Sequence, residues 1–123
     1  WIKTRHNELI VDAYNANPTS MRAALENFAA IDHPHKLLIL GEMRELGAAS
    51  VEEHRSIAAL ARQIKSGEVW FVGNEFKAHA VDSRWFPDVD AVKAELQENP
   101  LHDRLILVKG SNGTRLFQLP PLL

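Results

Sequence analysis

The sequence predicts a single α/β domain of the doubly wound, Rossmann-like type, with a mostly parallel sheet of about five or six strands and helices on both faces. Short segments that are nearly all apolar alternate with segments whose apolar residues recur every three or four positions. Strands that are apolar throughout are typical of parallel sheets, because helices cover both of their faces. The length of 123 residues suits one compact domain.

The N-terminal part predicts a strand, a helix and a second strand. Glu8–Tyr14 (ELIVDAY) has the short apolar run of a buried strand. In Pro18–Ile31 the apolar residues fall on one helical face. Lys36–Leu40 (KLLIL) predicts the second strand, and a loop with the sequence GEMRELGAA follows it.

The middle of the chain repeats this order. Ser50 and Glu53 have the spacing of a capping box at the start of a helix, and Gly67 is expected to end that helix. Glu68–Val72 (EVWFV) predicts a third strand, and Asn74–Ala80 allows a short helix.

The C-terminal part predicts a weak strand at Ser83–Phe86, a helix that opens at Pro87 and Asp88, and a clear strand at Arg104–Val108 (RLILV). The tail, QLPPLL, is expected to be a terminal extension, because its two prolines fit neither a central strand nor a helix interior.

The composition excludes several classes of function. Fourteen Lys and Arg stand against sixteen Asp and Glu without a basic stripe, so nucleic-acid binding is not expected. Apolar runs are too short to span a membrane, and the absence of cysteine fits a reducing compartment such as the cytoplasm. The chain starts at Trp1 rather than Met, and we expect it to be a domain of a longer protein.

Ligands of open α/β sheets bind outside the carboxyl ends of the strands. Four segments of this sequence are predicted to lie there: 12–17, 41–47, 73–76 and 109–115. The loop at 41–47 (GEMRELG) is also consistent with an ordinary connection whose charges are solvated. The six histidines form no convincing metal-binding set.

The first of these segments, DAYNANP, has two interpretations. Asn17 is explained as an N-cap and Pro18 as the first helical residue. Asp12, Tyr14 and Asn15 are not explained in this way, since a carboxylate at the end of a buried strand is costly unless it has a partner. Spacing alone leaves turn and binding site equally open.

The last segment, KGSNGTR, combines a cation at Lys109, hydroxyls at Ser111 and Thr114, and two glycines. Such a loop can cradle a carboxylate or a phosphate. It is not a Walker A loop, because G-x-x-x-x-G-K-[ST] does not occur in the chain.

Four motifs in order resemble one family of bacterial ligases. DAYNANPTSMRAALE, LGEMRELG, EEH and VKGSNGTR are similar to segments of the Mur ligases, and the Y-N-A-N-P form resembles those that add D-alanyl-D-alanine to UDP-N-acetylmuramoyl tripeptide. The resemblance covers roughly residues 9–117. It implies that residues 1–123 are the C-terminal domain of a three-domain enzyme.

The resemblance also implies a reaction. In this family ATP, with Mg²⁺, phosphorylates the tripeptide carboxylate, and the amine of D-alanyl-D-alanine attacks the acyl phosphate, releasing phosphate. The P-loop and the metal ligands belong to a central domain, over which the C-terminal domain closes. We therefore expect a cytoplasmic, monomeric ligase of peptidoglycan precursor synthesis, and we expect this domain alone to be inactive.

By the same resemblance, the nucleotide side of the site is formed by Asp12, Tyr14, Asn15 and Asn17. Lys109 and Ser111 are the residues expected to face the dipeptide carboxylate or the developing oxyanion. The chain departs from the family pattern at three positions. It has Val11 and Glu42 where the family often has Asp, and Asn112 where the family usually has Arg. Another amino-acid ligase of the Mur or folylpolyglutamate type, or a binding module without chemistry, remains an alternative.

Overall fold

The computed structural model describes residues 1–65 and 67–123. Its strands and α-helices follow one another as β1 (Ile2–Lys3), β2 (Glu8–Asp12), α1 (Pro18–Ala29), β3 (Lys36–Gly41), α2 (Ser50–Arg62), β4 (Gly67–Val72), β5 (Arg84–Phe86), α3 (Val89–Glu98) and β6 (Leu105–Lys109). Short 3₁₀ helices form the connections η1 (Gly47–Ala49), η2 (Asn74–His79), η3 (Asn112–Thr114), η4 (Leu116–Gln118) and η5 (Pro120–Leu122).

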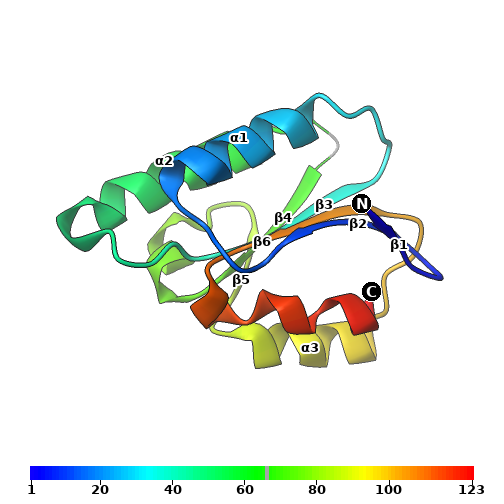
Figure 1. Ribbon diagram of the computed structural model, residues 1–123. Helices are drawn as coiled ribbons and strands as arrows, with labels where there is room; N and C mark the ends of the chain where they lie inside the picture. Colours follow the sequence, from blue (N-terminus) through cyan, green and yellow to red (C-terminus); the bar gives the residue numbers. More distant parts are fainter. Residues whose placement is uncertain (66) are drawn as a thin grey trace.

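The six strands form one sheet in the order β1-β2-β6-β3-β4-β5. β1 is antiparallel to β2, and all other neighbours are parallel. α1 and α2 cover one face, and α3 with the C-terminal 3₁₀ turns covers the other (Figure 1). The α/β fold predicted from the sequence is confirmed, with β1 as an additional edge strand.

Successive side chains of the buried strands point to opposite faces of the sheet, so a separate hydrophobic core forms on each face. In β3, Leu38 and Leu40 pack in the cluster under α1 and α2, whereas Leu37 and Ile39 pack in the cluster under α3. This follows from strand geometry, in which successive side chains point to opposite faces. An all-apolar strand therefore supplies both cores at once, as the sequence pattern predicts.

The helix starts agree with the sequence in one case and differ in another. The Asn17 side chain accepts a hydrogen bond from Ser20 N at 2.8 Å, and Ser20 Oγ accepts one from Asn17 N at 3.1 Å, so α1 begins with a capping box. The capping box expected at Ser50 and Glu53 is wrong. η1 runs directly into α2, so Ser50 already has helical backbone angles and Ala49 is the N-cap, without a side-chain cap.

Two further expectations need correction. α2 ends at Arg62, and Gly67 is the first residue of β4, where it pairs in register with Lys36. The tail is not an extension, because its residues Leu119 and Leu123 are buried in the cluster under α3. The prolines fit because a 3₁₀ turn accepts Pro at its start.

Candidate functional site

The strand order places a crevice at the carboxyl ends of β2, β6 and β3. β6 lies between β2 and β3 in the sheet. The chain leaves β2 and β3 toward the face covered by α1 and α2, but it leaves β6 toward the face covered by α3. Loops that diverge to opposite faces leave an opening between them, which is where open α/β sheets bind ligands.

A salt bridge joins two of the three strands that border this crevice, β2 and β6. Asp12 and Lys109 are register partners at the ends of β2 and β6. Lys109 Nζ donates to Asp12 Oδ2 at 2.6 Å and to the carbonyl oxygen of Asn15 at 3.0 Å. The Lys109 side chain is 2% exposed and the Asp12 side chain 54% exposed. A buried ammonium requires such partners, so this contact fixes the loop after β2.

Tyr14 lies on the outside of the same loop. Its ring is parallel to that of Phe117, with ring centroids 5.4 Å apart and an interplanar angle of 7°. Tyr14 is 68% exposed, so the pair presents an aromatic surface to solvent. This surface lies at the edge of the crevice formed by the loops after the carboxyl ends of the strands, which we call the rim. Such a surface can stack on a planar ligand.

Two cavities open along the rim. One, which we call the Tyr14 cavity, has a volume of about 520 Å³ and is lined by Tyr14, Asn15, Ala16, Arg44, Glu45, Ser111, Asn112 and Gly113. The other, the Gly73 cavity, has about 310 Å³ and is lined by residues of the loops after β3, β4, β5 and β6. Ser111 Oγ is buried and has no hydrogen-bond partner among the residues that the structure describes. A buried hydroxyl left unpaired is unfavourable unless a ligand or water completes it.

The loop after β3 is held from both sides by polar contacts. Glu42 Oε2 accepts a hydrogen bond from Glu75 N at 3.0 Å, and Glu42 Oε1 lies 3.1 Å from Arg44 Nη2. Gly73 makes room for this carboxylate, because a Cβ at Gly73 would come within 2.7 Å of it. Its φ of 110° also favours glycine.

His54 ties this loop to α2 from the inside. It is completely buried, and Met43 N donates to its Nε2 at 2.9 Å. An accepting Nε2 carries no proton, so the proton is on Nδ1, which lies 2.8 Å from the Ser50 carbonyl oxygen. Both ring nitrogens thus have hydrogen-bond partners, and His54 links the loop after β3 to α2 beneath the rim.

Comparisons with known proteins show the family to which the chain belongs. The family model described as Mur ligase, glutamate ligase domain matches residues 1–112. The chain belongs to this Mur ligase family. The match includes Asp12, the loop after β2 and Lys109, but it ends at residue 112, the first residue of η3, so η4 and η5 lie beyond it.

Two relatives of this chain have the same name, UDP-N-acetylmuramoyl-tripeptide--D-alanyl-D-alanine ligase. The protein from Treponema pallidum is 33% identical over 123 residues, which cover 93% of this chain and 27% of the relative. The protein from Rickettsia prowazekii is 31% identical over 124 residues, which cover 96% of this chain and 28% of the relative. The chain therefore spans between 27% and 28% of the length of these two relatives.

Solved structures share the fold. MurF from Acinetobacter baumannii is 28% identical, with a TM-score of 0.75 over 96% of this chain and 27% of that one. The MurF ligase of Thermotoga maritima in complex with ADP has a TM-score of 0.81 over 98% of this chain and 29% of that one. At 18% identity, the second likeness shows the fold alone.

The structure brings most of the candidate residues of the Mur ligase domain together. Asp12 and Lys109 are in contact, and Tyr14, Asn15 and Ser111 share the lining of the Tyr14 cavity. Asn17 is exposed and caps α1, as its position before Pro18 predicts.

Three residues that shape this rim were not predicted from the sequence: Arg44, Phe117, and His54 as the link between the loop after β3 and α2. The position of His54 in the EEH segment and of Arg44 in GEMRELG was visible in the sequence. Their contacts were not, because they depend on partners in other elements.

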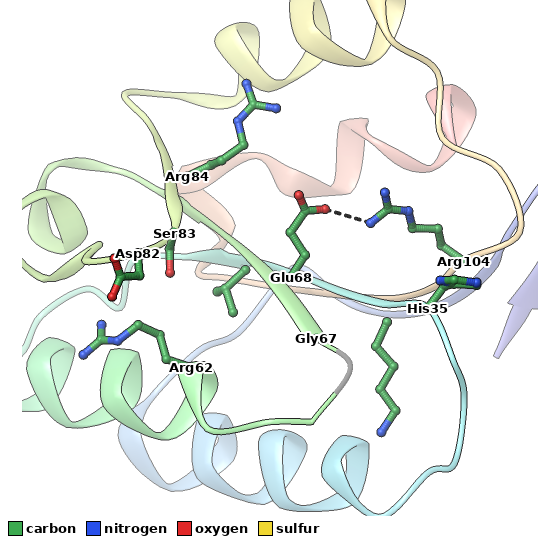
Figure 2. Close-up of a pocket in the computed structure, with 10 residues that line it drawn as sticks. His35, Arg62, Gly67, Glu68, Asp82, Ser83, Arg84 and Arg104 are labelled. Atoms are coloured by element: carbon green, nitrogen blue, oxygen red, sulfur yellow. Dashed lines mark hydrogen bonds and ion pairs between the residues drawn. The ribbon is translucent and has the colours of Figure 1, made fainter.

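A third hollow lies at the amino ends of the strands, away from the rim. Figure 2 shows this cavity of about 870 Å³, which is rich in basic residues. Its cations have partners within the protein: Arg104 bonds Glu68 at 2.7 Å, and Arg84 bonds Glu95 at 2.8 Å. The hydrogen bond from Arg84 lowers the pKa of Glu95. Lys36 and Arg62, which also line the hollow, donate to the carbonyl oxygens of Phe28 and His79. Because these cations already have partners within the protein, this hollow is a weaker ligand site than the rim.

The described residues offer no group of three or more His, Cys, Asp or Glu side chains that could hold a metal ion. In the same part of the chain, no helix is long and apolar enough to cross a membrane.

We predict that His54→Ala lowers the free energy of unfolding by about 2–4 kcal/mol, because it leaves Met43 N unpaired in the core and opens a cavity. Urea denaturation of the 123-residue chain measures this change. His35→Ala is the matched control, since His35 is exposed and the change should stay within about 0.5 kcal/mol. Equal effects of the two substitutions would show that the hydrogen bonds of His54 do not contribute to stability.

Proposed function

We propose that the chain is the C-terminal domain of a three-domain ligase that uses ATP to join D-alanyl-D-alanine to UDP-N-acetylmuramoyl tripeptide in peptidoglycan precursor synthesis. The observation that carries the proposal is the joining of DAYNANP and KGSNG at one crevice through Asp12 and Lys109. The names of the two relatives favour this substrate pair over other amino-acid acceptors. The complete protein would be a monomeric, cytoplasmic enzyme.

The rim fits the nucleoside part of ATP. The exposed ring of Tyr14, supported by Phe117, can stack on adenine, and the half-exposed carboxylate of Asp12 can accept hydrogen bonds from ribose hydroxyls. Asn15 and Asn17 belong to the same loop and complete this side of the site. When bound, ATP supplies the phosphoryl group that activates the tripeptide carboxylate.

The described residues do not fit a Mg²⁺ ion, since they include no cluster of suitable ligands. We therefore place the metal ligands on a central domain and assign no step to a metal here. The absence of a Walker A motif in the chain agrees with this division.

The dipeptide side of the site is assigned to Ser111 and Lys109. Ser111 Oγ is available to donate to a ligand oxygen, since it has no partner in the part of the chain that the structure describes. Lys109 is buried against Asp12 and Asn15, so it holds the two loops in place and adds positive charge beneath the site. Closure of the domain over the acyl phosphate would exclude water, which would otherwise hydrolyse it.

The substrate assignment is tested by phosphate release from the complete protein that carries this domain. We expect release that requires ATP, UDP-N-acetylmuramoyl tripeptide and D-alanyl-D-alanine together. Glutamate in place of the dipeptide serves as the control acceptor and should give no release. Turnover with glutamate, and none with the dipeptide, would assign the domain to a different ligase of the family.

The nucleotide role of Tyr14 has its own test. In the complete protein, Tyr14→Ala should raise the KM for ATP by about tenfold, because loss of one stacking contact costs on the order of 1–3 kcal/mol. Tyr14→Phe keeps the ring and should leave this KM near the wild-type value. A KM for ATP that Tyr14→Ala does not change would remove the ring from the nucleotide site.

A further inference from the structure

The rim needs a positive group that can reach a ligand, and Lys109 is poorly placed for this. Its side chain is 2% exposed, and two of its three N–H donors are used by Asp12 and the Asn15 carbonyl. A ligand could reach this buried ammonium only if it displaced one of these contacts, so Lys109 is better suited to holding the two loops than to binding a ligand directly.

Arg44 has the exposure and the position that Lys109 lacks. Its side chain is 53% exposed, and it contributes to the lining of both the Tyr14 cavity and the Gly73 cavity. The guanidinium lies against Gly113, where an added Cβ would be 3.0 Å from its central carbon. A residue larger than glycine at 113 would push the cation away from the loop after β6.

Arg44 has an ion-pair partner in its own loop, which favours one orientation of its guanidinium. Glu42 Oε1 lies 3.1 Å from one guanidinium nitrogen, and the other oxygen of Glu42 accepts the backbone N–H of Glu75. Glu42 is thus anchored to the neighbouring loop and holds Arg44 in turn. A guanidinium has five N–H donors in a planar fork, so one contact with Glu42 leaves others for a planar anion.

The Tyr14 cavity offers Arg44 a partner donor. Ser111, whose buried Oγ has no hydrogen-bond partner within residues 1–65 and 67–123, lines the same cavity. A carboxylate has two oxygens and can accept from a guanidinium and from a hydroxyl together. Glu45 is the other charged residue of this lining, and its side chain is exposed, as that of Arg44 is.

We propose that Arg44 binds the terminal carboxylate of the incoming dipeptide, together with Ser111 Oγ. The inference rests on the proposed function, because it takes D-alanyl-D-alanine as the acceptor. It makes Arg44 a substrate-binding residue supplied by the loop after β3, while Lys109 positions the loops on either side of it.

The test uses the complete protein with two acceptors, D-alanyl-D-alanine and its C-terminal amide, which lacks the carboxylate charge. Arg44→Gln should raise the KM for the dipeptide about 10- to 100-fold, the effect expected for loss of a charged hydrogen bond. The KM for ATP should stay unchanged. With the amide as acceptor, wild type and Arg44→Gln should have similar KM values.

Arg55→Gln is the matched control, since Arg55 is an exposed arginine on α2 whose partner is Glu52. It should leave the KM for both acceptors unchanged. A dipeptide KM that Arg44→Gln does not alter, an equal penalty with the amide, or a rise in the KM for ATP instead would overturn the role of Arg44. Failure of the proposed function is a separate result, because wild type would then not ligate D-alanyl-D-alanine at all.

Discussion

The arrangement of the rim depends on the contact between Lys109 and Asp12. These residues are 97 positions apart in the sequence, but the parallel pairing of β2 and β6 makes them neighbours. Burial of the ammonium is tolerable only because a carboxylate and a carbonyl receive it, so both loops must adopt one relative position. The position of Asn15, and with it one wall of the Tyr14 cavity, follows from this requirement.

A second set of polar contacts fixes the loop after β3. His54 accepts a hydrogen bond from the backbone N–H of Met43, and Glu42 accepts one from the backbone N–H of Glu75. These buried or shielded contacts leave other side chains exposed to the crevice, among them Tyr14 and Arg44. The rim thus has an inner layer of hydrogen-bonded side chains and an accessible outer layer, which suits a surface that must meet a ligand and another domain.

The sequence predicted much of the fold because its local patterns are strong. All-apolar strands such as β3, and the Asn17–Pro18 start of α1, depend on near neighbours and were confirmed. The predicted capping box at the start of α2 was wrong because η1 runs directly into the helix. The prediction of a terminal extension was wrong because the burial of Leu119 depends on contacts with the α3 side of the sheet. The strand order, and therefore the meeting of Asp12 with Lys109, involves long-range contacts that periodicity does not encode.

The most direct test of this account is a double-mutant cycle on Asp12→Asn and Lys109→Met in the complete protein. The measured quantity is kcat/KM for phosphate release that depends on D-alanyl-D-alanine. If the pair organises the rim as one unit, either single change removes the same interaction, and the double variant should be within about threefold of the more impaired single variant. Losses that multiply, so that the two residues act independently, would contradict the account.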